Sequence, residues 1–251
     1  MTWQRQFSTL RQIKFISSLF THSVSHFSIK KYFDFSQTIN MTTPLIYHSL
    51  ESILNLLEKS ENKNVDGVNE LLDIYNNANG QKMKHEASGE LKKYPLIILE
   101  GLDGSGKSTV GKRVAKKLNA VQWRTPPDSI NHLRHLFETN SILRTAYYSM
   151  GNYIAALEVQ LILKDKPVVM DRFWHSTAAY AIAQAVEDYP DKYEMPPAND
   201  KIYCWPEDLF RPDIVLLLDV SEQVRLQRLS RRKSYTAQEN LLKDCSKFRQ
   251  K

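Results

Sequence analysis

The spacing of hydrophobic and polar residues changes near residue 94. From there on, short apolar runs rich in β-favouring residues alternate with longer stretches of helical period. Two of the runs, "PVVMD" and "DIVLLLDV", are apolar throughout, which is typical of parallel strands covered on both faces. The predicted strands are 95–100, 120–124, 167–171 and 213–220, and the predicted helices lie near 107–118, 128–138, 141–163, 175–187 and 221–232. This alternation predicts an α/β fold with a parallel sheet and helices on both faces.

Before residue 94 the pattern is helical and then polar. Residues 45–59 carry an apolar stripe of helical spacing, and 68–75 form a second, shorter amphipathic stretch. The polar segment 76–93 is interpreted as a linker. We therefore expect a leader at 1–33, a helical extension with its linker at 34–93, and a larger α/β domain at 94–251.

The leader carries most of the net charge of +6. Residues 1–33 hold five basic residues and no acidic one, whereas 34–251 hold 29 basic and 28 acidic residues. With its apolar residues at helical spacing, the leader has the composition of a mitochondrial transit peptide, which predicts the mitochondrial matrix; a disordered basic tail is the alternative. The nearly neutral remainder gives no reason to expect a nucleic-acid partner. No apolar run is long enough to predict a membrane span.

A glycine-rich turn, "GLDGSGKS", joins the first predicted strand to the helix after it. Its spacing is that of a P-loop, in which glycines let backbone N–H groups surround phosphate oxygens at a helix N-terminus. Lys107 supplies a charge for the phosphates of ATP, and the Ser108 hydroxyl can ligate Mg²⁺. A plain glycine-rich turn is the alternative. The predicted nucleotide-binding residues are Gly101, Leu102, Asp103, Gly104, Ser105, Gly106, Lys107, Ser108 and Thr109.

Asp171 and Arg172 follow the third predicted strand, at the edge of a parallel sheet where ligands gather. The carboxylate can hold Mg²⁺ through water or orient an acceptor, and the planar guanidinium can bridge phosphates. We predict Lys107, Asp171 and Arg172 as the catalytic group, with Ser108 and Asp171 at the metal. The alternative is an aspartate that caps the next helix beside a surface arginine. Asp219, at the end of the fourth strand, competes as a metal ligand.

Three more side chains are candidates for the site. Asn152 lies in an aromatic-rich helical stretch, and its amide can bind the edge of a pyrimidine with a donor and an acceptor. Arg228 and Arg231 come after the fourth strand and can close on a triphosphate as part of a lid. A solvent-facing helix is the alternative for these two arginines.

Several segments carry a resemblance to a known family. "LEGLDGSGKST", "DRFWHSTAAYA" and "PDIVLLLDV" resemble the thymidylate kinase family of P-loop nucleoside monophosphate kinases, from about residue 94 onward. "YYSMGNYIAA" and "WPEDLFRPDIVLLLDV" are most similar to its mitochondrial UMP/CMP kinase branch. The resemblance implies a three-layer P-loop fold and transfer of the γ-phosphoryl group of ATP to CMP, UMP or their deoxy forms. It leaves dTMP open as an acceptor.

The resemblance also implies roles for single residues. Asp103 matches the position that holds the sugar hydroxyl of the acceptor, and Asp171 with Arg172 matches a pair near the metal and the phosphates. Arg124 matches a phosphate-contacting arginine, although "RTPPD" departs from the usual sequence there. Asn152 stands where thymidylate kinases tend to carry arginine, which favours the UMP/CMP branch.

The family pattern continues past "KDCSKFRQK" with a helix, a fifth strand and a final helix. We therefore expect four of the usual five strands and a kinase domain at 94–251 that is incomplete at its C-terminus. The main alternative function is an ATP-binding protein without catalysis, and a third is a deoxynucleoside kinase. The predicted partner is a small pyrimidine nucleotide, with a homodimer left open.

Overall fold

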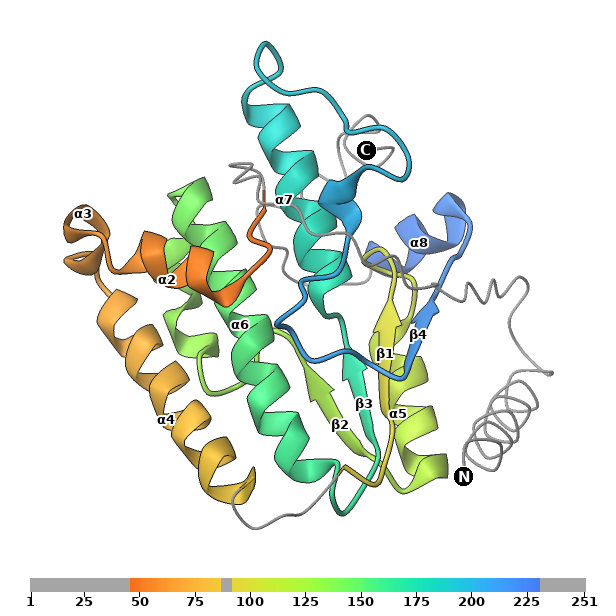
Figure 1. Cartoon of the computed structure of the whole chain (residues 1–251). Coiled ribbons are helices and arrows are strands. Elements are labelled where there is room, and N and C mark those ends of the chain that lie inside the picture. Colours follow the sequence, from red (N-terminus) through yellow and green to blue (C-terminus); the bar gives the residue numbers. More distant parts are fainter. Residues whose placement is uncertain (1–45, 87–91, 231–251) are drawn as a thin grey trace.

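The computed structural model describes residues 46–86 and 92–230, and within them four parallel strands form one sheet (Figure 1). The strand order is β2-β3-β1-β4. The strands are β1 (Leu96–Glu100), β2 (Val121–Arg124), β3 (Val168–Asp171) and β4 (Ile214–Leu217). The predicted parallel sheet is confirmed, and each strand begins one residue later than the apolar runs suggested. In the register of the sheet, Asp171 lies beside Leu99, so β1 and β3 end at the same edge.

The helices after β1 follow the predicted order. They are α5 (Lys107–Leu118), α6 (Ser141–Ile162), α7 (Trp174–Asp188) and α8 (Glu222–Leu229), with the 3₁₀ helices η1 (Asn131–Phe137) and η2 (Lys201–Tyr203) between them. Only α5 has the predicted bounds. The stretch predicted at 128–138 is the 3₁₀ helix η1, because its backbone N–H groups bond three residues back, as from Leu133 to Ile130.

Alternate side chains of β1 enter two hydrophobic clusters, one on each face of the sheet. Leu96 and Ile98 belong to the large cluster that includes α6 and α7. Ile97 and Leu99 belong to a smaller cluster that includes side chains of α5. This alternation follows from the two-residue period of a strand. The result is a three-layer arrangement with helices on both faces (Figure 1).

The segment before β1 folds as α2 (Leu50–Leu57), α3 (Ser60–Lys63) and α4 (Val68–Glu86). The prediction of a linker over 76–93 is wrong up to residue 86, because α4 continues through it. The polar composition concealed the helix, yet Ala78 is buried and extends the apolar stripe of α4 by one turn.

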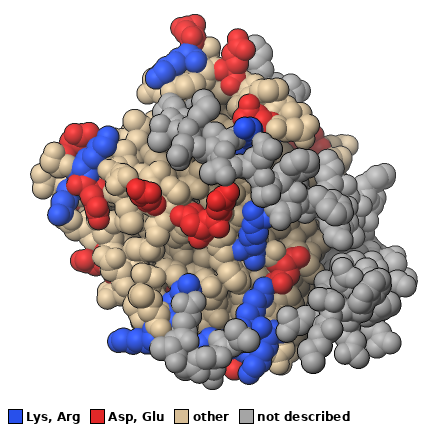
Figure 2. Space-filling model, in the orientation of Figure 1, with Lys and Arg blue, Asp and Glu red and all other residues tan. Residues whose placement is uncertain are grey.

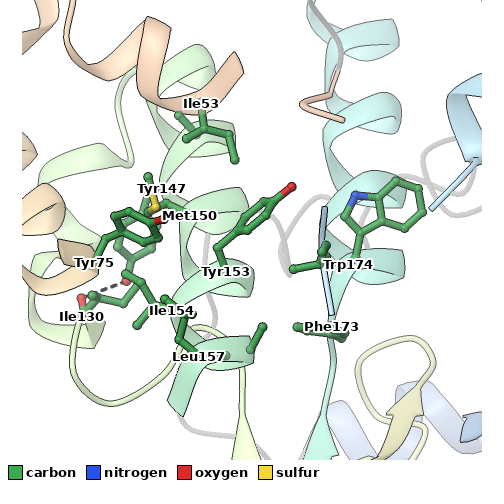
Figure 3. Close-up of a cluster of buried hydrophobic side chains, with 14 of the residues drawn as sticks. Ile53, Tyr75, Ile130, Tyr147, Met150, Tyr153, Ile154, Leu157, Phe173 and Trp174 are labelled. Carbon is green, nitrogen blue, oxygen red and sulfur yellow. Dashed lines mark hydrogen bonds between the residues drawn. The ribbon is translucent and has the colours of Figure 1, made fainter. Parts of the chain in front are cut away.

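A buried cluster ties this segment to α6 (Figure 3). Ile53 and Tyr75 pack with Met150 in the same core as the sheet residues. The Tyr147 hydroxyl, 3.0 Å from the backbone oxygen of Ile130, donates a hydrogen bond to it. Each fully buried aliphatic side chain contributes about 1.5–3 kcal/mol relative to exposure. Residues 46–86 therefore stabilise the helix that carries one wall of the candidate site.

The charged surface of the face in Figure 2 mixes both signs, with Lys, Arg, Asp and Glu side chains separated by other residues. Among the helices of the described residues, none is long and apolar enough for a membrane crossing. The predicted leader at 1–33 and the predicted lid residue Arg231 lie outside the described residues, so both stay predictions.

Candidate functional site

The turn between β1 and α5 has the backbone that a P-loop needs. Gly101, Gly104 and Gly106 have φ values of 142°, 84° and 101°, in the region that L side chains rarely adopt. A Cβ atom on Gly101 would lie 2.4 Å from the backbone oxygen of Leu218, so the turn also packs tightly against the end of β4. Glycine is therefore required there for both conformation and space.

Lys107 lies in this turn with only 6 % of its surface exposed. Its Nζ donates to the backbone oxygens of Gly101 and Leu102, at 2.9 and 3.1 Å. Burial and the charge of Arg172 lower the pKa of Lys107 to about 8, although the nearby carboxylates oppose this. The ammonium group is thus mostly charged at neutral pH and lies where phosphate oxygens would replace the two carbonyls.

Ser108 and Asp171 meet beside the P-loop. The Ser108 hydroxyl donates to Oδ2 of Asp171 over 2.7 Å, which joins the start of α5 to the end of β3. Both groups are hard oxygen ligands, and Mg²⁺ usually takes one or two such ligands together with water and substrate phosphates. No group of three His, Cys, Asp or Glu residues gathers among the residues described. The donor set therefore fits a Mg²⁺ ion that arrives with a triphosphate.

Asp103 is held by two side chains from the β3–α7 region. Arg172 Nη2 donates to Asp103 Oδ1 over 2.6 Å, and the Tyr180 hydroxyl donates to Oδ2 over 2.8 Å. Burial alone would raise the pKa of Asp103, but the charges of Arg172 and Lys107 and the bond from Tyr180 lower it overall. Asp103 is thus ionised and fixed in orientation, as an acceptor for a ligand hydroxyl must be.

Arg172 has an unusual backbone, with a φ of 69°. This left-handed conformation is uncommon outside glycine, so the surroundings must hold it. The Arg172 N–H donates to the backbone oxygen of Leu99 over 3.0 Å. Its side chain donates through Nη1 to Ser176 Oγ, also over 3.0 Å. The strained turn aims the guanidinium back toward the P-loop.

Glu100 supports the same turn, and it was missed in the sequence analysis although it ends an apolar strand as Asp171 does. Its buried Oε1 accepts from the N–H groups of Phe173 and Ser176, at 2.9 and 3.3 Å, and Oε2 accepts from the Ser176 hydroxyl. Burial raises the pKa of Glu100. The carboxylate caps the start of α7 and so positions Ser176, which in turn bonds to Arg172.

A cavity of about 230 Å³ lies beside Asp103 and Arg172. Its wall combines the turn after β2, η1, α6 and α7. The other residues that line it are Thr125, Pro126, Arg134, Arg144, Thr145, Tyr148, Ser176, Thr177, Tyr180, Ala181 and Gln184. Three arginines and one aspartate among the lining residues give it a formal charge of +2. The cavity therefore suits a dianionic ligand.

Two of these arginines, Arg134 and Arg144, were missed in the sequence analysis. Arg134 bonds to Glu138 over 3.1 Å and lies 5.7 Å from the Tyr148 ring centre. Arg144 donates to the backbone oxygen of Glu138 over 2.9 Å. One signal was available: Arg144 lies in the first turn of α6, where the helix dipole disfavours a cation. A cation in that position indicates an anionic partner.

Two arginines of α8 contact the P-loop from the other side. Arg228, a predicted site residue, donates to the backbone oxygens of Gly104 and Ser105, at 3.2 and 2.9 Å. Arg225 was not predicted; it is only 1 % exposed, pairs with Glu222 and donates to the backbone oxygen of Asp103 over 3.3 Å. The start of the predicted lid is thus fixed to the loop.

The comparisons with known proteins agree with this geometry. The thymidylate kinase family model matches residues 99–251, which include the P-loop and the Asp171–Arg172 pair. The chain belongs to the thymidylate kinase family. The resemblance stated from the sequence is confirmed by this match.

Individual proteins are also similar to this chain. The chain is 46% identical to human "UMP-CMP kinase 2, mitochondrial" over 161 residues, 63% of this chain and 35% of that protein. It is 28% identical to a thymidylate kinase of Leptospira interrogans over 176 residues, 63% of this chain and 79% of that protein. A solved thymidylate kinase from Candida albicans matches with a TM-score of 0.46 and 21% identity, over 63% of this chain and 74% of that chain. The chain spans about a third of the length of the human relative.

In this member of the thymidylate kinase family, two predicted substrate residues lie outside the cavity wall. Arg124 pairs with Asp128, its Nε 2.9 Å from Oδ1, and its side chain is 58% exposed. Asn152 is completely buried, and its Nδ2 donates to Thr177 Oγ1 over 3.0 Å. Because Thr177 lines the cavity, its side chain separates the Asn152 amide from the cavity.

Proposed function

We propose that this chain is a nucleoside monophosphate kinase that transfers the γ-phosphoryl group of ATP to a pyrimidine nucleotide and releases the diphosphate. The observation that carries the proposal is the cavity with a formal charge of +2 directly beside the P-loop. The two sites share Asp103 and Arg172, so a donor and an acceptor would meet there.

The charge of the cavity favours a monophosphate over a free nucleoside as acceptor. A phosphate monoester carries between about −1.5 and −2 charges at neutral pH, which balances the formal charge of the wall. A deoxynucleoside kinase would leave three arginines and one aspartate facing an uncharged acceptor. Arg172 is already paired with Asp103 and Arg134 with Glu138, whereas Arg144 bonds to a backbone oxygen, so a monophosphate would supply the anion that matches the excess positive charge of the wall.

In this proposal the residues act by position and charge. The P-loop and Lys107 hold the triphosphate, and Arg172 lies between the two phosphates and balances the charge that develops during transfer. Asp103 accepts a hydrogen bond from a sugar hydroxyl of the acceptor. Ser108 and Asp171 would hold Mg²⁺, which neutralises the phosphate charges when it is bound.

The choice of a pyrimidine rests on the comparison with the human relative, whose name specifies UMP and CMP and which is 46% identical over the shared region. We extend those acceptors, with their deoxy forms, to this chain. The same name and the basic leader support a mitochondrial location, and we propose the matrix as the compartment.

The proposal is tested by offering the purified chain ATP, Mg²⁺ and one acceptor at a time. The acceptors are CMP, UMP, dCMP, dUMP, dTMP and the free nucleosides, with Lys107→Ala as the inactive reference. Diphosphate from CMP or UMP is the expected product. Product from free nucleosides alone would replace the proposal with a deoxynucleoside kinase. Binding of ATP without product from any acceptor would favour the non-catalytic alternative.

A further inference from the structure

A hydrogen-bonded pair joins the two helices that form the α6–α7 wall of the cavity. Asn152 of α6 donates through Nδ2 to Thr177 Oγ1 of α7, over 3.0 Å. Asn152 is fully buried, and within the described residues its Oδ1 has no hydrogen-bond partner. Thr177 itself lines the cavity. A buried amide with one unpaired end therefore lies directly behind a hydroxyl that a ligand can reach.

The two side chains are coupled because each can both donate and accept. When Asn152 donates to Thr177, the hydroxyl hydrogen of Thr177 is free to point into the cavity. When the Asn152 carboxamide turns over, its oxygen accepts from Thr177, and the hydroxyl then presents a lone pair to the cavity. Thr177 can therefore donate to a ligand only while Nδ2 of Asn152 faces it, and turning the amide over restricts the hydroxyl to accepting.

Neither orientation satisfies the whole amide. With Nδ2 toward Thr177, the buried Oδ1 is unpaired in the described structure. After the amide turns over, the buried Nδ2 would take its place as the unpaired end. Since an unpaired buried polar group is costly in both cases, the two orientations lie closer in energy than they would in a fully bonded amide. A ligand hydrogen bond of ordinary strength is then enough to select between them.

The difference between uracil and cytosine matches these two orientations. At position 4 of the ring, uracil carries a carbonyl oxygen that accepts, whereas cytosine carries an amino group that donates. Tyr148 lies one helical turn before Asn152 on α6 and also lines the cavity, so an aromatic ring is available beside the pair for a flat base. The pair and the ring together offer a hydrogen-bonding group and an aromatic surface to either pyrimidine.

We propose that the Asn152–Thr177 pair lets the acceptor site take both cytosine and uracil, by turning the Asn152 amide so that Thr177 donates to uracil or accepts from cytosine. Thr177 would contact the base, and Asn152 would be a positioning residue that acts through it. This inference rests on the proposed function and adds how that site selects its base. The simpler alternative is that the pair only ties α6 to α7.

The decisive variant is Asn152→Asp, because an ionised carboxylate only accepts. It would hold the Thr177 hydroxyl hydrogen and leave a lone pair facing the cavity. Because burial raises the pKa of a carboxyl group, the ratio of kcat/KM for CMP to that for UMP is measured from about pH 7 to 9.5, and we expect it to be about tenfold above the wild-type ratio once the carboxylate is ionised. Thr177→Val should lower kcat/KM for both acceptors by about tenfold, because it removes both roles. Thr177→Ser, which keeps the hydroxyl, should have kcat/KM values for both acceptors close to those of wild type.

A second measurement leaves α6 unmutated, so it does not depend on whether Asn152→Asp folds. The acceptor is a pyrimidin-2-one nucleoside monophosphate, which carries only hydrogen at position 4. We expect wild type to use it about tenfold less well than CMP, and Thr177→Val to use the two equally well. A structural tie between the helices would give no such dependence on the acceptor.

The outcomes separate this inference from the proposed function. If wild type uses neither CMP nor UMP, the proposed function fails and the inference with it. If wild type uses only one of them, or if folded Asn152→Asp keeps the wild-type ratio, the kinase proposal stands and the inference is overturned. An equal loss with the pyrimidin-2-one acceptor in wild type and Thr177→Val would also overturn it.

Discussion

The P-loop and the cavity beside it are built in different ways. The P-loop is one contiguous turn whose shape depends on three glycines with positive φ and on backbone carbonyls that receive Lys107. The cavity is assembled from side chains of several segments that are distant in the sequence. The first kind of site is local and the second depends on tertiary packing, so the two should respond differently to substitution.

Asp103 and Arg172 connect the two sites through a hydrogen bond of 2.6 Å. Asp103 belongs to the P-loop and also lines the cavity, whereas Arg172 reaches it from the end of β3. A substitution at a P-loop residue other than Asp103 should change turnover to the same extent with every acceptor. A change in the outer cavity wall should affect the acceptor and leave the affinity for ATP unchanged.

Lys107→Ala is expected to have the largest effect. Loss of a charged group that is aimed at the transferred phosphate should lower kcat by at least about a hundredfold. The loss should be equal for all acceptors, since Lys107 does not line the cavity. Steady-state kinetics with several acceptors measures this, and thermal unfolding should show a melting temperature close to wild type.

The matched control is Lys116→Ala, which removes an exposed lysine from the same helix. It should leave turnover unchanged. Turnover by Lys107→Ala close to the wild-type rate would remove Lys107 from the catalytic group. A loss confined to one acceptor would contradict the separation of the two sites.

Arg144→Ala is the corresponding test of the cavity. A hydrogen bond to a charged group contributes about 1.5–3 kcal/mol, so the KM of the monophosphate should rise between about tenfold and a hundredfold. The affinity for ATP should not change, because Arg144 bonds to the backbone of Glu138 and lines the cavity, and within the described residues it makes no hydrogen bond to the P-loop. Titration with ATP alone and kinetics with a varied acceptor separate the two quantities.

Arg113→Ala provides the control for charge, since it removes an exposed arginine from α5. A similar rise in KM for that variant would mean that the effect comes from the overall charge of the protein. An Arg144→Ala variant with weaker ATP binding and an unchanged acceptor KM would assign Arg144 to the donor site.

This contrast also explains what the sequence could predict. The P-loop, Asp171 and Arg172 were found because a short motif and the end of an apolar strand contain the needed information. Arg134 and Arg144 were missed because their common cavity exists only after η1 and α6 pack beside α7. Periodicity identifies elements but does not show which polar side chains of distant elements meet.

The same distinction applies to the fold. Periodicity gave all four strands within the described residues to within a few positions, since each is a short apolar run. It failed at α4, where a polar surface and Gly80 concealed a helix that is held by packing on α6. Asn152 was predicted as a substrate-binding residue from the chemistry of its amide, and the structure places its side chain behind Thr177. Helical spacing alone cannot distinguish a position in the wall from one behind it.

The pH dependence of ATP binding should sharpen the picture of the P-loop. The pKa of Lys107 is lowered to about 8, so the free protein loses this charge as the pH rises through that value. Bound phosphate favours the charged form and raises the pKa again. The Kd for ATP should therefore increase between about pH 7.5 and 9, by up to about tenfold, with uptake of a proton on binding.

Isothermal titration in buffers of different ionisation enthalpy measures both the affinity and the proton uptake. Lys107→Met should bind ATP more weakly, and its Kd should not change between about pH 7.5 and 9. A wild-type affinity that does not vary with pH would show that the ammonium of Lys107 stays charged or does not contact the phosphates.

Gly80→Ala is expected to have the smallest effect and provides a reference outside both sites. Gly80 lies inside α4, and a Cβ atom built there meets nothing within 4 Å. Alanine should therefore raise the free energy of unfolding by about 0.5–1 kcal/mol, because it restricts the unfolded chain and favours the helix. Chemical denaturation measures the change, while kcat and both nucleotide affinities should stay at wild-type values.

The paired substitution is Gly104→Ala in the P-loop, where the same added methyl group has the opposite consequence. Gly104 has a φ of 84°, and its Cβ would lie 2.8 Å from the backbone oxygen of Arg225. This variant should lose both stability and ATP affinity, since α8 and the loop cannot keep their contact. If the two alanines changed stability in the same direction, the P-loop would not depend on its glycines, and the contrast between a backbone-built loop and a side-chain-built cavity would fail.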